Sequence, residues 1–391
     1  MTFTPSIAPL DASKTVLELT SKPKPVPAPN SLEVASITAY TDHMLLVSWN
    51  AKHGWDTPRI VPYGPISLEP GASIFQYATN CYEGMKAFRG FDGRLRLLRP
   101  MYNCERMLAS ATRISLPTFE PEELLKLIKK ICSVEAPKWL SKNQAGSALY
   151  IRPTIMGTDT SLGVKVPEQA LLCIFLTYWP NPYQQVSGVT PKLGSRLLAS
   201  SGHSVRAWPK GTGEAKIGAN YGPALVEHAE ARRRGYDQIL WLFGPDRQIT
   251  EAGGSNIFVM WWTPDGVLQL ITPPLDEDKL ILAGGTRRNL LELSRDMFAV
   301  DGENGAERCE VLERKITMFE VQQAADEGRL AAVFVAGTAF WVYPVAEICF
   351  NGRDIMVDVG RVPHVAMLRS RLEDIVYGRE ESSWVDIVEE D

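Results

Sequence analysis

The chain has 391 residues, of which 45% are hydrophobic and 22% are charged, and its formal net charge is −5. This length predicts two domains with enough core to fold without disulfides or metals. The composition is that of an ordinary globular protein. The mildly acidic balance gives no reason to expect a nucleic acid or an anionic membrane surface as partner.

The cysteines and the N-terminus point to a reducing compartment. The cysteines form no CxxC pair and have no histidine at metal-ligand spacing, so we expect buried thiols and no metal site. No apolar run reaches the roughly 18 residues of a membrane helix. Asp11 and Glu18 precede the first arginine, Arg59, and no signal-peptide core is present. The expected location is the cytoplasm.

The first half of the chain alternates strands and helices after a proline-rich arm. The arm covers residues 1–30 and is expected to be extended. Turn residues at 91–93 and apolar spacing then predict strands and two helices, the second of which is amphipathic. The expected strands are 43–49, 95–98, 148–156 and 170–178, and the expected helices are 100–112 and 120–135.

The second half is richer in strands. Residues 179–191 contain three prolines and no periodicity, and we expect the interdomain linker there. The expected strands are 238–243, 256–262, 267–272, 331–336, 346–350 and 354–357, and helices are expected over 222–234, after Gly285 and from about Pro363. The predicted fold is therefore α/β (α+β), with a small domain over 31–178 and a larger β-rich domain over 192–391.

A glycine-rich run, Gly211 to Gly222, surrounds one lysine, Lys216. Glycines allow a backbone to approach a ligand closely, although a lysine on a mobile surface loop would have the same surroundings. A P-loop would need Ser or Thr directly after its Gly-Lys, and a dinucleotide fingerprint would need a third glycine where Lys216 stands. Glu251, next to Gly253 and Gly254, supplies an acid in a second glycine cluster. An amine and a carboxylate in such settings suit a pyridoxal phosphate site.

Gly284 and Gly285 precede the helix that carries Leu290 and Leu293 on one face. Thr286 is the expected N-cap. The free amides of the first turn and the positive end of the helix dipole would then form a phosphate-binding site. An ordinary capped helix would show the same residues. The turn at Gly337-Thr338-Ala339 is expected to expose further amides.

Several motifs in one order make the chain, from about Asp42 to Trp384, similar to the branched-chain amino acid aminotransferases of fold type IV. They are YEGMKAFRG, LYIRP, GTGEAKIGANYG, QITEAGGSN, LAGGTRR and AGTA. The resemblance implies a two-domain fold-type IV enzyme with pyridoxal 5′-phosphate between the domains. It implies amino transfer between L-leucine, L-isoleucine or L-valine and 2-oxoglutarate by a ping-pong route, and a homodimer whose loop Thr160 to Val164 reaches the neighbouring subunit's site.

The resemblance also implies individual roles. Lys216 would bind the cofactor aldehyde and carry the proton, and Glu251 would pair with the pyridine nitrogen. Tyr221 would bind the phenolate, while Arg89, with Gly285 and Thr286, would bind the phosphate. The residues implied to contact substrate are Tyr77, Tyr82, Tyr150, Arg152, Gly254, Thr338 and Ala339. Taken singly, Arg89 would be expected in a surface ion pair and the tyrosines in the core.

The chain departs from the family pattern at Gly254 and Ser255, where Thr-Met is usual. These changes favour an alternative: a specialised transaminase of secondary metabolism, with a D-amino acid or an amine as substrate, or an aminodeoxychorismate-lyase-like enzyme. A non-catalytic relative with a scaffold role would be expected to lack Lys216 or Glu251, and both are present.

Overall fold

The computed structural model describes residues 7–29, 31–180, 192–302, 305–339 and 341–390. The chain forms two compact units. Unit 1 takes the described residues of Met1–Thr190, Ala215–Ala219 and Glu373–Asp391, and unit 2 takes those of Pro191–Glu214 and Asn220–Leu372. The predicted linker, 179–191, lies outside the described residues except for its first two positions. The predicted division differs from the observed one because two later segments return to unit 1.

Unit 1 is built on one sheet, which has ten strands in the described residues. The strands follow the order β1-β4-β2-β9-β8-β6-β7-β19, with β3 paired to β2 and β5 paired to β8; only β1 and β4 are parallel. Their bounds are β1 Val16–Leu17, β2 Tyr40–Asn50, β3 Gly54–Trp55, β4 Arg59–Pro62, β5 Asn80–Tyr82, β6 Met85–Arg89, β7 Leu95–Leu98, β8 Ala148–Gly157, β9 Gln169–Trp179 and β19 Val385–Val388.

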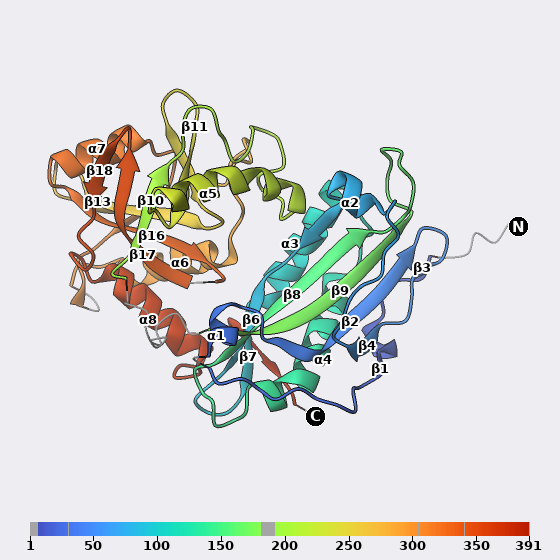
Figure 1. The fold of residues 1–391 in the computed structure, drawn as a ribbon. Coiled ribbons are helices and arrows are strands. Elements are labelled where there is room, and N and C mark those ends of the chain that lie inside the picture. Colours follow the sequence, from blue (N-terminus) through green and yellow to red (C-terminus); the bar gives the residue numbers. More distant parts are fainter. Residues whose placement is uncertain (1–6, 30, 181–191, 303–304, 340, 391) are drawn as a thin grey trace, which may run out of the picture. The chain divides into compact units, whose positions relative to one another are not determined.

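Two long helices, α3 (Pro100–Arg113) and α4 (Pro121–Trp139), cover one face of this sheet (Figure 1). Each begins with proline, which loses no hydrogen bond at the first turn. Leu124, Ile128 and Ile131 of α4 are fully buried and pack with strand residues such as Leu97 and Ile151 in one core. Both predicted helices are confirmed. The shorter helices are α1 Leu32–Ala35 and α2 Ser73–Tyr77.

The N-terminal arm is ordered over residues 7–29 and lies on unit 1. It contains the 3₁₀ helix η1 (Ala12–Lys14) and strand β1, which pairs with β4. Leu10 is only 3% exposed and belongs to the unit 1 core. The Thr20 amide donates to His43 Nε2 over 2.9 Å, and the Lys24 amide donates to Asp42 over 2.7 Å. The arm is therefore an integral part of this sheet's edge.

Unit 2 is built on a second sheet, with nine strands in the described residues. Its order is β12-β11-β10-β17-β16-β13-β14-β15, with β18 paired to β17. The bounds are β10 Ser195–Ala199, β11 Gln238–Phe243, β12 Gln248–Ala252, β13 Asn256–Trp262, β14 Leu268–Thr272, β15 Glu310–Glu313, β16 Leu330–Gly337, β17 Trp341–Phe350 and β18 Arg353–Met356.

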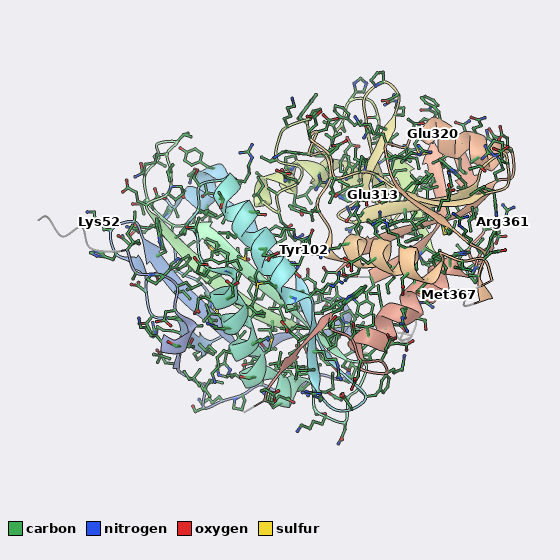
Figure 2. The ribbon with its side chains drawn as sticks, turned by 180° about the vertical axis from the view of Figure 1, so that it is seen from behind. Lys52, Tyr102, Glu313, Glu320, Arg361 and Met367 are labelled. Carbon is green, nitrogen blue, oxygen red and sulfur yellow. The ribbon has the colours of Figure 1, made fainter. Side chains whose placement is uncertain are left out.

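The helices of unit 2 pack on this sheet (Figure 1). They are α5 Leu225–Arg233, α6 Gly285–Met297, α7 Met318–Asp326 and α8 His364–Val376, whose end from Glu373 belongs to unit 1. The 3₁₀ turn η3 (Gly222–Ala224) precedes α5, and η2 (Gly218–Asn220) begins in the Ala215–Ala219 segment of unit 1. Gly235, predicted to end α5, has φ +84°, a value that favours glycine. At the start of α7, Glu320 and Thr317 form a reciprocal capping box (Figure 2).

Candidate functional site

Lys216 belongs to a five-residue segment, Ala215–Ala219, that is inserted into unit 1. Its amide donates to Ser110 Oγ over 2.9 Å, and its carbonyl accepts the Tyr82 amide over 3.0 Å. Ala215 and Ile217, on either side, are buried in the unit 1 core. The Lys216 ammonium lies 5.0 Å from the centre of the Tyr82 ring. The glycine-rich run therefore holds this lysine by its backbone, which a mobile surface loop would not do.

Tyr82, Tyr150 and Arg152, which are predicted to contact substrate, lie close together on strands β5 and β8. The Arg152 guanidinium is 4.7 Å from the Tyr82 ring centre and 5.3 Å from that of Tyr150, and its Nη2 donates to the Tyr150 hydroxyl over 3.3 Å. Core residues such as Cys81 and Ile151 alternate with these side chains along the strands, so the three point away from the face that α3 and α4 cover. Arginine and aromatic faces attract one another in this arrangement.

A buried acid, Glu83, lies between Lys216 and helix α3. Arg106 donates to its carboxylate from Nε over 2.6 Å and from Nη2 over 2.8 Å, and Asn103 donates over 2.8 Å. Burial opposes ionisation of Glu83, but the charges of Arg106 and Lys216 and these hydrogen bonds outweigh it and lower its pKa. Glu83 is therefore an anion at neutral pH.

Arg106 is a cation that the sequence interpretation missed. It is four residues before Ser110, so both lie on one face of α3, and Ser110 binds the Lys216 amide. Its side chain is only 9% exposed, and it also lies 5.7 Å from the ring of Tyr102, which Figure 2 labels. An arginine on the buried face of an amphipathic helix was the available signal, because such a charge needs a partner or a ligand.

Arg89 does not have the role predicted for it. It is fully buried, and its Nη1 and Nη2 both donate to the Glu390 carboxylate over 2.6 Å. Its Nε donates to the Leu140 carbonyl, and the same Nη groups reach the carbonyls of Gly93 and Ala136. This network uses the guanidinium inside unit 1, so the assignment of Arg89 to a phosphate is wrong on physical grounds.

Tyr77, on α2, is 37% exposed, and its hydroxyl donates to the carbonyl of Leu162. It thus fixes the loop Thr160 to Val164, whose Leu162 and Val164 side chains are 71% and 88% exposed. The prediction that Tyr77 contacts substrate remains a prediction.

Glu251 lies on β12 of unit 2 and is 2% exposed. The Arg206 guanidinium forms an ion pair with its carboxylate at 2.5 Å, and the Leu282 amide donates to it over 2.7 Å. Asn256 donates to both Glu251, over 3.4 Å, and the Leu282 carbonyl, over 3.0 Å. Arg206 pairs with this carboxylate, and Asn256 connects it to the segment that enters α6.

Helix α6 begins at Gly285, and its N-cap, Gly284, makes no side-chain capping bond. Thr286 is therefore the second helical residue, and the prediction that it caps the helix is wrong. A Cβ on Gly284 would lie 2.0 Å from Asn256 Oδ1, so glycine is needed for this close packing. Uncapped amides at the positive end of a 13-residue helix suit an anion.

A second group of unit 2 residues surrounds the turn after β16. Thr338 and Ala339 form the predicted turn. A Cβ on Gly337 would lie 3.1 Å from Ser255 Oγ, which places the turn between β12 and β13 beside it. A Cβ on Gly254 would meet nothing within 4 Å. Tyr221 is half-buried at the start of η3.

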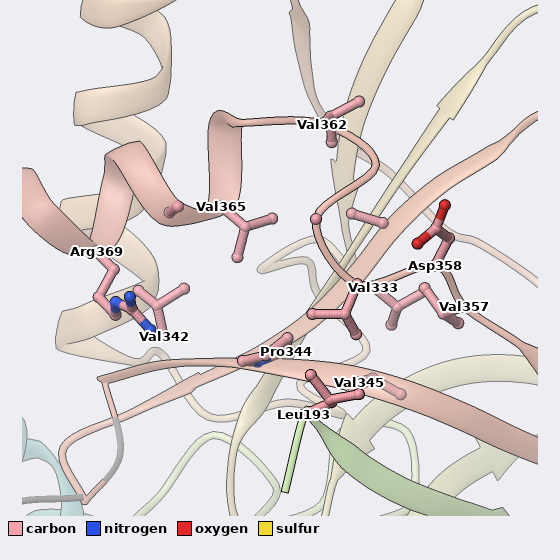
Figure 3. A pocket seen from close by; sticks show the side chains of 14 residues that line it. Leu193, Val333, Val342, Pro344, Val345, Val357, Asp358, Val362, Val365 and Arg369 are labelled. Carbon is pink, nitrogen blue, oxygen red and sulfur yellow. The ribbon is translucent and has the colours of Figure 1, made fainter. Parts of the chain in front are cut away.

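Other candidate sites are few in the described part of the chain. Within it, no cluster of His, Cys, Asp or Glu could hold a metal ion, and no helix is long and apolar enough to cross a membrane. A cavity of about 220 Å³ in unit 2 lies among valines of β16, β17 and α8, with Arg369 and Asp358 at its rim (Figure 3). None of the predicted site residues lines it.

Comparison with known proteins identifies the family. Residues 80–348 match the model of the family described as amino-transferase class IV. The chain is 40% identical over 380 residues to a mitochondrial branched-chain-amino-acid aminotransferase of Schizosaccharomyces pombe, covering 95% of this chain and 84% of that protein. It is 41% identical over 365 residues to a cytosolic one of Mus musculus, covering 92% and 89%.

The fold agrees with these relatives. The crystal structure of a branched-chain aminotransferase from Thermoproteus uzoniensis with norvaline superposes with a TM-score of 0.65 at 25% identity, covering 88% of this chain and all of that one. The predicted fold class, a mixed α/β protein of fold type IV, is therefore confirmed.

Proposed function

Because this chain belongs to the class IV aminotransferase family, we propose that it is a pyridoxal phosphate-dependent branched-chain-amino-acid transaminase. It transfers the amino group of L-leucine, L-isoleucine or L-valine reversibly to 2-oxoglutarate. The observation that carries this proposal is the fixed position of Lys216, held by backbone bonds to Tyr82 and Ser110. The names of the relatives support the substrate class.

The side chains and backbone amides described above are chemically suited to hold pyridoxal phosphate. When bound, pyridoxal phosphate supplies an electron sink that acidifies the substrate Cα–H bond. Lys216 would hold its aldehyde, and Glu251, which is paired with Arg206, would bind its ring nitrogen. The uncapped amides of Gly285 and Thr286 would bind its phosphate. Arg106, instead of Arg89, would be the cation for that phosphate, and Tyr221 would bind the phenolate oxygen.

Lys216 also moves the proton at the substrate Cα, since an amine is a suitable general base once substrate has displaced it. Its position beside Tyr82 and near the Glu83 carboxylate limits where that amine can go. The Thr338 and Ala339 amides would bind the α-carboxylate, with Gly254 and Ser255 beside them. Tyr77, Tyr82, Tyr150 and Arg152 would surround the substrate side chain.

We propose a homodimer and a cytosolic location. The exposed apolar loop at Leu162 and Val164, fixed by Tyr77, supports a subunit contact, because exposed apolar side chains in one patch mark association surfaces. The cytosolic relative of Mus musculus is the observation in favour of the cytosol. Sedimentation of the purified protein and fractionation of cells test the two statements separately.

The decisive variant is Lys216→Ala. We expect it to lower the rate of leucine transamination by about 10³-fold or more, because loss of a positioned acid-base group alone costs roughly 10²–10⁴-fold. Visible absorption of the lysine-bound cofactor should disappear, and the thermal melting curve should stay close to wild type. Lys210→Ala, at an exposed position directly before the glycine-rich run, is the control. Covalent attachment of the cofactor to another lysine after borohydride treatment would contradict the assignment.

A second candidate function is favoured by Gly254, where a Cβ would meet no atom within 4 Å. The missing side chain enlarges the space around the turn beside Gly337, which favours a specialised transaminase with a D-amino acid or an amine as substrate, or an aminodeoxychorismate-lyase-like enzyme. Steady-state rates with leucine, D-alanine, aromatic amino acids and 1-phenylethylamine distinguish the two. If no branched-chain L-amino acid is turned over, the first proposal is wrong.

A further inference from the structure

A row of alternating cations and aromatic rings extends beyond the predicted substrate residues on unit 1. Past Arg152 and Tyr150, the Tyr150 ring stacks on Trp179 with centres 4.5 Å apart. The Lys86 ammonium lies 5.1 Å from the Trp179 ring centre. Lys86 is directly opposite Tyr150 in the pairing of β6 with β8, so both side chains emerge on the same face of the sheet.

Tyr150 is fixed at both ends of its side chain. Trp179 covers its ring, and Arg152 donates to its hydroxyl. That hydroxyl lies over Gly84, where a Cβ would be only 1.9 Å away. Gly84 is thus the place where the backbone of the YEGMKAFRG motif makes room for the tyrosine. A shift of Trp179 would therefore be transmitted to Tyr150 and then to Arg152.

Lys86 itself is only 6% exposed. Burial lowers the pKa of its ammonium to about 7, because removal from water disfavours the charged form. Groups whose pKa is shifted strongly by burial are concentrated at functional sites.

The side chains around Lys86 come from three strands. From β8, Arg152 lies on the same face, beyond Tyr150. From β7, Arg96 is opposite Phe88 and forms an ion pair with Asp92 at 2.6 Å. From β9, the neighbour is the uncharged Trp179. Lys86 is thus the titratable member of a mainly cationic wall, with the acid of the group, Asp92, engaged by Arg96.

We propose that Lys86 is a positioning and specificity-determining residue for the dicarboxylate partner, glutamate or 2-oxoglutarate. Through Trp179 it holds the Tyr150–Arg152 pair, and its charge adds to the positive potential that receives the second carboxylate. A branched-chain acid has no such carboxylate and gains little from this charge. The inference rests on the proposed function. It adds to that function one residue, Lys86, that influences which 2-oxo acid the enzyme prefers as amino-group acceptor.

The direction of the pH dependence follows from the ammonium. Below about pH 7, Lys86 is protonated and favours the dicarboxylate; above that value it becomes neutral and the advantage declines. Loss of one unit charge near a bound carboxylate is expected to weaken its binding by roughly tenfold at an intermediate dielectric. The KM for 2-oxoglutarate should therefore rise by about that factor from pH 6 to pH 8, relative to the KM for a monocarboxylic 2-oxo acid.

The test compares wild type, Lys86→Met and Lys86→Arg in the cofactor-loaded protein. KM and kcat are measured for 2-oxoglutarate and for 4-methyl-2-oxopentanoate at both pH values, and binding of each acid is measured by calorimetry. At both pH values, Lys86→Met should bind 2-oxoglutarate as weakly as wild type binds it at pH 8. Lys86→Arg, which keeps its charge, should bind 2-oxoglutarate tightly throughout. Melting temperatures of both variants establish that they fold.

Equal loss of affinity for the two acids in Lys86→Met, or a wild-type ratio that does not change with pH, would overturn the inference. Failure of the proposed function gives a different result: wild type would not transaminate leucine at all. In that case the calorimetric comparison of the two acids still decides the role of Lys86.

Discussion

At the scale of single residues, two buried arginines of unit 1 differ in the groups that their guanidinium charges contact. Arg89 is enclosed, and it is bound by Glu390 and by backbone carbonyls. Breaking one partner of a buried ion pair leaves an uncompensated charge, which costs about 3–5 kcal/mol. Arg106 meets the buried Glu83, close to the lysine segment. Both arginines are therefore expected to matter for stability, and Arg106, close to the lysine segment, is expected to matter for ligand binding as well.

Glu390→Gln tests this division. We expect it to lower the free energy of unfolding by about 3 kcal/mol, measured with urea, and to leave cofactor affinity unchanged. Arg106→Met should instead weaken pyridoxal phosphate binding by at least about tenfold, since it removes a charge-assisted phosphate contact. Arg94→Met, at an exposed position, is the control. Strong loss of cofactor affinity in Glu390→Gln would restore Arg89 as a phosphate ligand.

The sequence could place Arg89 in a family motif but could not reveal its partner, because Glu390 is 301 positions away. Lys216 was recognisable from its glycines and from the motifs around it. Thr286 was expected as a cap because its residue type favours that position, yet α6 starts one residue earlier. The role of a residue could be predicted where the residues around it in the sequence are also its neighbours in the folded protein.

At the scale of elements, strands with turn residues at both ends were predicted best. The predicted bounds of β7, β11 and β13 agree with the structure. Strand β12, which carries Glu251, was missed because it is short. Helix α7 was missed although Thr317 and Glu320 have the spacing of a capping box, which is a signal for the start of a helix. The order of the arm was also beyond prediction, since it depends on Asp42 and His43 receiving its backbone amides.

Asp42→Asn tests how the arm is held. Burial opposes ionisation of Asp42, but hydrogen bonds from Lys138, the Lys24 amide and Trp139 outweigh it and lower its pKa below 3.8. Its contribution is therefore complete above that value and is lost as the pH falls through the lowered pKa. We expect the variant to be less stable by about 1–3 kcal/mol near neutral pH. Unfolding by urea, followed by tryptophan fluorescence, measures this.

The difference between wild type and Asp42→Asn should shrink below about pH 4, where the wild-type carboxylate takes up a proton. Asp56→Asn, at an exposed position of unit 1, should have little effect at any pH. A constant difference across the whole range would show that the charge of Asp42 does not hold the arm.

At the scale of the whole molecule, unit 1 is assembled from three separate segments of the chain. Its last strand, β19, pairs with β7 in the register Val385 to Leu98, and Glu390 binds Arg89. The predicted boundaries assigned everything after residue 191 to one domain. Periodicity describes elements one at a time, so it could not show that the end of the chain returns to the first sheet.

A chain ending at Gly378 tests the importance of this return. It keeps α8 and loses β19 and Glu390, which exposes the edge of β7 and leaves Arg89 as an unpaired buried cation. We expect hydrogen exchange of the β6 and β7 amides to accelerate strongly, while the amides of β13 and β16 stay protected. Unchanged protection in β6 and β7 would mean that the C-terminal segment adds little to unit 1.

The pairing of β19 with β7 also sets an order of events during synthesis. A ribosome releases residues from the N-terminus onward, and domains tend to fold as their segments emerge. The larger part of unit 1 is translated first, yet it must wait, with an open sheet edge, until residues 385–388 leave the exit tunnel. Unit 2, translated later, has all its strands available earlier. The N-terminal half is therefore the part that most needs chaperone protection in the nascent polypeptide.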